Sequence, residues 1–466
     1  MPHADCLAGA ARTDITPTWP VMQGGFGQRT TPSEGALDRI HGKALYLRGS
    51  GADADALLLV TADLIAIPKP LAVAVLAGIT SATGLAPRQV CLCASHTHSG
   101  PVPWDSGGAP GAAAYSAFLR DALVEVALRA VATARPARLG SGVGQVDLFL
   151  NRRTRGEPNI VDPRVAVLRA QAVDDGSDIA VLFGVGCHPV TLGWDNMLIS
   201  GDFPGVAQRV VEGALGDAVA LFFNSTEGNV IPVTSPNRDA LDPRGYHGGT
   251  AADAEKLGAA VAAEVLRVLP GIEVRDDVQV AIARRELALP ARNAAFDLDA
   301  ARSRLAAADA VLAAELGADF ATRANGYLWA LASRHVVERD SSEDEMRRLM
   351  IACCEHLGLA ARVAHGKALA PAQVPLQVLR IGDLELLALP GEVLVEVGQA
   401  WSAAAGHGKA FIVGLANAHL RYLPAAVHFA EPQAGVRYET VTAGLEAGGV
   451  EAALVAATEM LVEVRG

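Results

Sequence analysis

The chain has 466 residues, of which 51% are apolar and 5% aromatic, and its formal net charge is −12 from 39 Lys plus Arg against 51 Asp plus Glu. This composition is typical of a globular protein and excludes a disordered or fibrous chain. The acidic charge and the lack of a basic cluster argue against a nucleic-acid partner. The six cysteines lie mostly in apolar runs without paired CxxC motifs, which predicts reduced core residues and no disulfide framework.

Short apolar runs without polar alternation recur along the chain and predict strands that are covered on both faces. They are KALYLR (43–48), ALLLVTADLIAI (56–67), QVCLCAS (89–95), DIAVLFGVGC (178–187), AVALFFN (218–224), LELLALP (384–390) and AFIVGL (410–415). Helical patterns lie between them, at 113–133, 204–213, 251–268 and 393–405. Because strands and helices alternate, we expect an α/β fold with a mixed β-sheet core flanked by helices.

The segment from about 297 to 366 is almost wholly helical in pattern and predicts a helical insertion packed on the sheet. No Ser- or Pro-rich linker divides the chain, so we expect a single domain over 1–466. No charged segment followed by a long apolar run opens the sequence, and no later segment approaches about 18 unbroken apolar residues. We therefore expect a cytoplasmic protein without stable membrane association, and assembly into a homo-oligomer stays open.

Histidines and a carboxylate follow several of the predicted strands. His96 and His98, in the stretch ASHTHSGP, come directly after the run VCLC, and residues i and i+2 of an extended segment face the same side. His188 and Glu392 follow two further runs. Because groups beyond the carboxyl ends of strands share a crevice in an open α/β sheet, these side chains are expected to converge. Two imidazoles and a carboxylate suit zinc and leave a position for an activated water, so the pattern predicts a zinc site.

Motifs of other chemistries are absent from the sequence. It contains no GxSxG elbow, no GxxxxGK[ST] phosphate loop and no HExxH, and the segment GVGQVD does not complete a dinucleotide fingerprint.

The sequence resembles the neutral/alkaline ceramidase family, which are zinc-dependent amidases that cleave the amide of N-acylsphingosines. The matching segments run in family order over essentially the whole chain. They are AGAARTDITP (8–17), ASHTHSGP (94–101), NRR (151–153), GCHPVTLG (186–193), ISGDFPGVAQ (199–208), LQVLRIGDLELLALPGE (376–392) and GLANAHLRYLP (414–424). The resemblance implies that His96, His188, Glu392 and Tyr422 are the zinc ligands.

The resemblance also implies catalytic roles for three further residues. His98 corresponds to a histidine that faces the substrate, and it would take a proton from the zinc water or deliver one to the leaving nitrogen. Arg152 lies in a segment that lines the family's site and holds a carbonyl or hydroxyl oxygen of the substrate. Tyr438 is similar to a tyrosine that donates to the developing oxyanion.

The chain departs from the family pattern in three ways. Within NSTEGNVIP, Thr226 replaces an asparagine and Ile231 replaces the serine associated with ceramidase activity, and isoleucine has no hydroxyl to act as nucleophile or hydrogen-bond partner. We expect no carboxyl-terminal immunoglobulin-like domain and no export signal in this chain. We therefore expect a substrate other than ceramide.

The sequence thus predicts a zinc-dependent hydrolase that cleaves the amide of a small non-peptide N-acyl compound with metal-activated water. A zinc-dependent esterase or lactonase, and a non-catalytic ligand-binding homologue, are the alternatives. For Glu227, in STEGN, we expect a surface turn carboxylate, with a proton acceptor as the alternative. Asp202, in SGDFPG, would either orient a ligand histidine or cap the following helix.

Overall fold

The structure is a computed structural model, and it describes residues 6–51, 54–104, 111–153, 158–235, 249–292, 297–324, 328–365, 370–431 and 437–466. In these residues the expected α/β class is confirmed, because a mixed sheet is flanked by helices. All six cysteines are buried and form no disulfide, as expected. None of the helices in this part of the chain has the length and apolar character needed to span a bilayer.

A sheet of eight strands forms the larger part of the core, in the order β11-β9-β8-β6-β1-β3-β4-β5. Its strands are β1 (Leu7–Asp14), β3 (His41–Arg48), β4 (Ala56–Ala62), β5 (Val90–Ala94), β6 (Arg135–Gln145), β8 (Arg164–Ala172), β9 (Asp178–Val185) and β11 (Val219–Asn224). The edge pairs β4–β5 and β9–β11 are parallel and the inner pairs are antiparallel. The apolar runs predict all of these parallel strands, and the run 43–48 predicts β3, which is antiparallel to both neighbours.

A second sheet of four strands packs against the first. It contains β13 (Val280–Leu289), β14 (Ala372–Ile381), β15 (Leu384–Ala388) and β17 (Ala410–Val413), in that order. The pair β15–β17 is parallel and the others are antiparallel. Side chains from both sheets form one buried cluster, including Leu59 and Cys93 from the larger sheet and Leu386 and Phe411 from the smaller. Since successive side chains of a strand alternate in direction, the opposite faces of both sheets need other cover.

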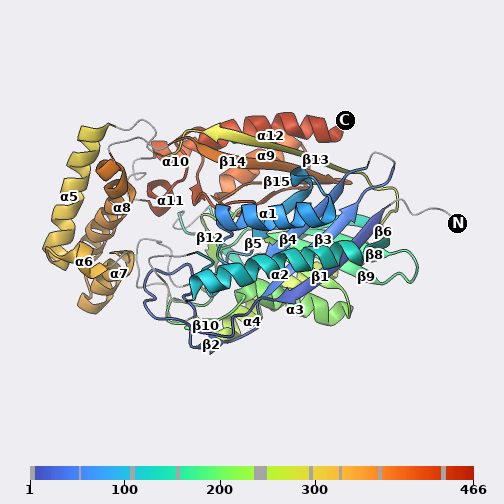
Figure 1. Cartoon of the computed structure of the whole chain (residues 1–466), viewed down its shortest axis with the longest axis horizontal. Helices are drawn as coiled ribbons and strands as arrows, with labels where there is room; N and C mark the ends of the chain where they lie inside the picture. The colour runs from blue at the N-terminus through green and yellow to red at the C-terminus, as the bar shows by residue number, and fades with distance from the viewer. Residues whose placement is uncertain are drawn as a thin grey trace.

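Helices provide that cover, so the protein has four layers (Figure 1). On the larger sheet, α1 (Lys69–Thr83) and α2 (Ala112–Ala132) cover β3 to β5, while α3 (Asp202–Leu215) and α4 (Ala251–Val268) cover β8, β9 and β11. On the smaller sheet the cover is α9 (Val395–Ala405) and α12 (Gly449–Arg465). The sequence patterns predict α2, α3, α4 and α9, and the start of α4 is fixed by a capping box between Thr250 and Asp253.

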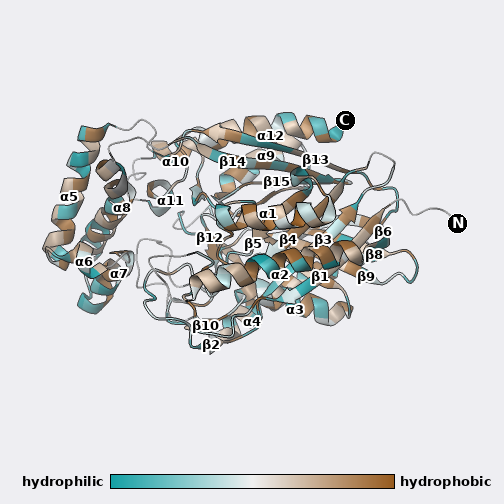
Figure 2. Ribbon diagram, viewed as in Figure 1, coloured by the Kyte–Doolittle hydropathy of each residue, from teal (hydrophilic) through white to brown (hydrophobic). Residues whose placement is uncertain are grey.

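The segment expected to be a helical insertion contains four helices: α5 (Leu298–Leu316), α6 (Phe320–Ala324), α7 (Leu328–Arg339) and α8 (Glu343–His365). They enclose an apolar cluster of their own, in which Leu312 and Met350 are fully buried. Figure 2 shows brown and teal residues alternating along α8, as in an amphipathic helix. The group lies at the end of the molecule opposite both chain termini (Figure 1). Tyr438 and Val441 of α11 (Tyr438–Val441) pack against its core.

Short elements complete the chain and form the surroundings of the site. They are β2 (Gly35–Ala36), β7 (Phe149–Asn151), β10 (Leu198–Ile199), β12 (Val230–Pro232), β16 (Glu392–Val393), β18 (Tyr422–Leu423) and α10 (Ala426–Ala430), with 3-10 turns at Pro87–Gln89 and Leu269–Gly271. The pair β7–β12 is antiparallel, and the pairs β2–β10 and β16–β18 are parallel.

Candidate metal centre

Asn224 joins the two opposite edges of the eight-stranded sheet. It is the last residue of edge strand β11, and its Nδ2 donates hydrogen bonds to the carbonyl oxygens of Ser95 and Cys187, both at 3.0 Å. Its Oδ1 accepts from the Cys187 amide at 3.2 Å. The segments that leave β5 and β9 therefore lie side by side. The next residue in each segment is a histidine, and the ring centroids of His96 and His188 are 4.9 Å apart.

Backbone carbonyls fix the orientation of both imidazoles. Nδ1 of His96 lies 2.7 Å from the carbonyl oxygen of Ile65, and Nδ1 of His188 lies 2.6 Å from that of Glu227. A carbonyl can only accept a hydrogen bond, so each Nδ1 carries the proton and each Nε2 of the neutral ring presents a lone pair. A backbone partner of this kind is usual for a metal-binding histidine.

Glu392 and Tyr422 lie opposite each other in the parallel pair β16–β18, which brings both side chains to the two histidines. Oε2 of Glu392 is 3.5 Å from Nε2 of His96 and 3.3 Å from Nε2 of His188. The phenolic oxygen of Tyr422 is 3.2 Å from Nε2 of His188. All four side chains are buried. Two imidazole nitrogens and a phenolic oxygen thus lie close to one carboxylate, a set of ligand atoms that fits a divalent cation such as zinc.

The ionisation of these groups suits a cation. Burial acts to raise the pKa of the Glu392 carboxyl, but the neighbouring imidazoles of His96, His188 and His419 hold this pKa well below its usual range. Burial and then the charge of Arg152 lower the pKa of His188 to about 4. At neutral pH Glu392 is therefore ionised and His188 is neutral.

The groups of the protein around Tyr422 disfavour the ionised form of its phenol. Burial and then the charge of Glu392 raise its pKa well above the usual value, and Arg152 acts against them. A divalent cation next to the oxygen would favour the phenolate, because it is the largest local charge.

His98 lies close to the two anchored histidines but is held differently. Its Nε2 is 3.4 Å from Nε2 of His96, and the ligand atoms of His96, His98 and His188 all lie within 4.8 Å of one another, so this group could hold a metal ion. Nδ1 of His98 is buried without a hydrogen-bond partner, and the ring packs on Phe26 with centroids 4.8 Å apart. Burial and then the charges of His96 and His188 lower its pKa well below the usual value. His98 therefore lacks the backbone anchor on Nδ1 that His96 and His188 have.

Arg152 and Tyr438 also reach the site. Nη2 of Arg152 donates to the phenolic oxygen of Tyr422 at 3.0 Å, and its Nε donates to Glu439 Oε1 at 2.9 Å. The ring of Tyr438 lies 5.5 Å from that of Tyr422, and burial raises the pKa of its phenol. The oxyanion contacts of both residues stay predictions, and the structure adds a direct contact of Arg152 with Tyr422.

A cavity of about 300 Å³ opens over this cluster. Six of the seven residues predicted for the site line it, and the seventh, His188, contacts Glu392 and Tyr422 beneath it. The other lining residues are Gly25, Phe26, Gln28, Ile65, Trp104, Trp329, His419, Arg421 and Thr442. Glycine is required at Gly25, where φ is +90° and a Cβ would lie 2.3 Å from Cγ of His98. The residues chosen from the sequence therefore share one site.

Two sequence-based expectations concerned carboxylates near this cluster. Glu227 is not a surface residue as expected: it is fully buried, and both of its carboxyl oxygens lack a hydrogen-bond partner. Its carbonyl, which holds His188, is the part that reaches the metal centre. Asp202 is the first residue of α3, and its carboxyl accepts hydrogen bonds from the amides of Leu192 and Phe203. The helix N-cap is Gly201 and no side chain caps it, so the expected capping role is not borne out.

Of the lining residues that were not predicted from the sequence, His419 and Trp329 contact predicted ones. His419 places Nε2 3.3 Å from Oε1 of Glu392, and it lies in the GLANAHLRYLP segment, where only Tyr422 was singled out. Trp329 comes from α7 of the helical insertion and stacks near Tyr438 with ring centroids 5.4 Å apart. No pattern in the helical stretch indicates that one of its aromatic residues faces a distant cavity.

Ile231 occupies an apolar position behind the site. It is fully buried in β12, opposite Leu150, and belongs to a cluster with Phe26 and Val190. Because Phe26 packs on His98, Ile231 supports the position of that imidazole through packing alone. It offers no polar group to a substrate.

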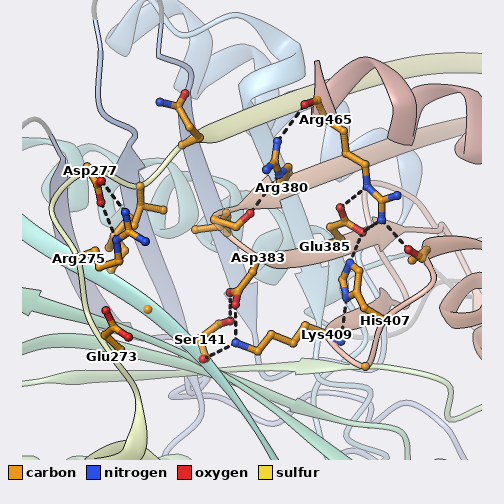
Figure 3. A pocket seen from close by; sticks show the side chains of 18 of the residues that line it. Ser141, Glu273, Arg275, Asp277, Arg380, Asp383, Glu385, His407, Lys409 and Arg465 are labelled. Carbon is orange, nitrogen blue, oxygen red and sulfur yellow. Dashed lines mark hydrogen bonds and ion pairs between the residues drawn. The ribbon is translucent and has the colours of Figure 1, made fainter.

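A larger cavity, of about 1180 Å³, lies elsewhere and is a second candidate site (Figure 3). Most of its charged residues are paired with one another: Arg465 and His407 bind Glu385, Lys409 binds Asp383, and Arg275 binds Asp277. These charges are compensated and no metal-ligating group converges there among the described residues. The smaller cavity is therefore the one that is equipped for metal-dependent chemistry.

Fold and site together define an α/β protein with a candidate metal centre built from histidines, a carboxylate and a tyrosine. No protein-family model and no curated protein matches the sequence. Among solved structures, the chain is similar to neutral ceramidase from Pseudomonas aeruginosa, with a TM-score of 0.68 at 20% identity over 99% of this chain and 74% of that chain. A ceramidase complexed with C2 gives a TM-score of 0.68 at 21% identity, over 99% and 75% of the two chains. The resemblance that the sequence motifs carry is thus confirmed at the level of the fold.

Proposed function

We propose that this protein is a zinc-dependent hydrolase of the neutral ceramidase type, which cleaves the amide bond of a small N-acyl compound other than a peptide. The observation that carries the proposal is the convergence of two imidazole Nε2 atoms on one carboxylate oxygen of Glu392, at 3.5 and 3.3 Å. The shared fold with neutral ceramidase and the lining of the cavity support the same reaction class.

In this proposal His96, His188, Glu392 and Tyr422 hold the ion. A bound zinc ion supplies a Lewis acid for the substrate carbonyl and lowers the pKa of a water to about 7. The protein keeps the histidines in the required tautomer through the carbonyls of Ile65 and Glu227.

The remaining steps use side chains of the chain itself. His98 takes the proton of the attacking water and delivers it to the leaving nitrogen, which its single unanchored ring permits. Tyr438 donates to the oxygen that gains charge when the carbonyl carbon becomes tetrahedral. Arg152 holds the Tyr422 oxygen in place and supplies positive charge next to it.

The size and walls of the cavity support a substrate other than ceramide. Its volume of about 300 Å³ is at the lower end of ligand pockets, which run from about 300 to 1,000 Å³. Trp104, Trp329 and Tyr438 bound it with rigid rings. Two long alkyl chains need more enclosed apolar space than this.

The test is the zinc content of the purified protein, measured by elemental analysis in wild type, His96→Ala and His188→Ala. His428→Ala is the matched control, because this histidine is also buried but does not line the cavity. We expect close to one equivalent in wild type and in His428→Ala, and less than a tenth of that in the two ligand variants. A full equivalent retained by His96→Ala would overturn the ligand assignment.

Activity is tested with paired short acyl amides and acyl esters of equal chain length. We expect turnover of the amides by the zinc-loaded wild type. Turnover of esters alone would favour the esterase alternative, and turnover of neither by a protein that binds zinc would favour a ligand-binding role.

A further inference from the structure

Arg421 is a cation at the cavity for which the described residues supply no counter-charge. It lines the cavity between His419 and Tyr422, and its side chain is exposed. In the part of the chain that the structure describes, its guanidinium makes no hydrogen bond or ion pair. The nearby Arg152 and Arg153 contrast with it, since both are buried and paired with carboxylates. The donors of Arg421 are therefore available to a ligand.

The backbone holds Arg421 at this place at a conformational cost. Its φ is +61°, in the left-handed region that is unfavourable for a residue other than glycine. The conformation is fixed because the Arg421 carbonyl accepts the amide of Glu392 at 2.9 Å, and a Cβ on Gly391 would lie 2.4 Å from that same oxygen. The cation is thus tied to the strand pair that carries Glu392 and Tyr422.

The charge around the cavity favours an anionic ligand. Glu392 is the only carboxylate among the described lining residues, and its charge faces the histidines of the metal centre. The charge of Arg152 is balanced by Glu439. Arg421 is left uncompensated at the cavity of a protein whose net charge is −12, where an anion would otherwise be repelled.

We propose that the cavity selects N-acyl substrates that carry a carboxylate, and that Arg421 is the specificity-determining residue that binds it. This inference rests on the proposed amide hydrolase function. A guanidinium presents two parallel N–H donors that match a carboxylate, and such charge-assisted bonds are roughly twice as strong as neutral ones. In the reaction the C–N bond breaks, the water oxygen adds to the acyl carbon, and the nitrogen leaves with a proton, so the products are a carboxylic acid and an amine.

The carboxylate could lie on either side of the amide, and three matched amides distinguish these cases. N-butyrylglycine carries it on the amine side, N-ethylsuccinamic acid carries it on the acyl side, and N-butyrylethanolamine is a neutral compound of similar size. We expect the wild type to show kcat/KM at least tenfold higher for one of the acids than for the neutral amide. In Arg421→Gln this ratio should fall at least tenfold, and in Arg421→Lys it should be partly kept.

Arg421→Gly separates recognition from folding. Glycine adopts a φ of +61° without strain, so this variant removes the guanidinium while relieving the backbone. Loss of the acid preference in both Arg421→Gly and Arg421→Gln supports the inference. If the wild type cleaves all three amides equally, or if the ratio is unchanged in both variants, the inference is wrong and the hydrolase stands. If no amide is cleaved by the zinc-loaded wild type, the proposed function itself fails.

Discussion

The guanidinium of Arg152 lies between Tyr422 and Glu439, donating to the phenolic oxygen at 3.0 Å and to the carboxylate at 2.9 Å. Glu439 also binds Arg153 at 3.3 Å. The side chains of the three charged residues are only 4 to 5% exposed. One buried carboxylate therefore holds two guanidinium groups, and one of these fixes a proposed metal ligand.

Removing the carboxylate should cost more than removing either of its partners. Glu439→Ala leaves two buried guanidinium groups side by side and should lower the free energy of unfolding by about 3–5 kcal/mol. Arg152→Met should cost less, because Glu439 keeps Arg153. Glu431→Ala is the control: that carboxylate pairs with Arg153 but is 31% exposed, so we expect less than about 1 kcal/mol. Urea denaturation measures all three, and equal losses would contradict the asymmetry.

Replacing His98 should separate proton transfer from metal binding. We expect His98→Gln to retain the zinc of the wild type, because the ring lacks the backbone anchor that His96 and His188 have. Loss of an acid–base group should lower kcat for an amide by about 10² to 10⁴. The effect on a matched ester should be smaller, because its leaving group needs less protonation. Zinc analysis and paired kinetics check this, and loss of zinc would instead make His98 a ligand.

Trp329 should control how long an acyl chain the cavity accepts. It packs against Gly27, where an added Cβ would lie 2.2 Å from Cδ1 of the indole. Trp329→Ala enlarges the cavity and should raise kcat/KM for octanoyl relative to butyryl amides. Gly27→Ala pushes the indole and should disturb cleavage of both. Val337→Ala, an exposed change on the same helix, should leave the ratio unchanged.

Asp202 should make the stability fall as the pH rises from about 4 to 6. Burial raises the pKa of its carboxyl to about 6, although the amides of Leu192 and Phe203 act against this. The folded protein therefore binds the proton more tightly, so the stabilisation is complete below the unfolded pKa of about 3.9 and is lost through pH 6, by up to about 1.4 kcal/mol per unit.

Asp202→Asn removes this titration. Asparagine tolerates the φ of +52° and keeps one acceptor for a backbone amide. Urea denaturation of both proteins from pH 4 to 7 isolates the contribution as the difference between them. A constant difference across that range would mean that Asp202 is ionised throughout.

The buried parallel strands and the histidines that follow them could be predicted from the sequence. A continuous apolar run indicates a strand covered on both faces, and the residues directly after a parallel strand lie where ligands bind. The antiparallel strands β1 and β6 were not predicted, since most of their residues are partly or fully exposed and the apolar signal is weak. Of the smaller sheet, the sequence predicted only the strands β15 and β17. Its packing on the larger sheet depends on contacts between distant parts of the chain, which no short sequence pattern indicates.

The burial of Glu227 could not be predicted from its neighbours in the sequence either. Polar neighbours such as Ser225 and Asn229 make STEGN look like a surface turn, yet the segment is enclosed by strand ends that come from distant parts of the chain. The place of Trp329 at the cavity could not be predicted for the same reason. A helical pattern shows on which face of the helix a residue lies, but not which other element packs against that face.

The proposed ligands come from both sheets: His96 and His188 follow strands of the larger one, and Glu392 and Tyr422 follow strands of the smaller. A nascent chain that has emerged only as far as residue 300 contains His96, His98 and His188 but lacks Glu392 and Tyr422. If the four proposed ligands hold an ion together, its full coordination would wait until the halves have docked, and metal acquisition would mark the completion of maturation. In a cell short of zinc, correctly assembled but inactive molecules would accumulate.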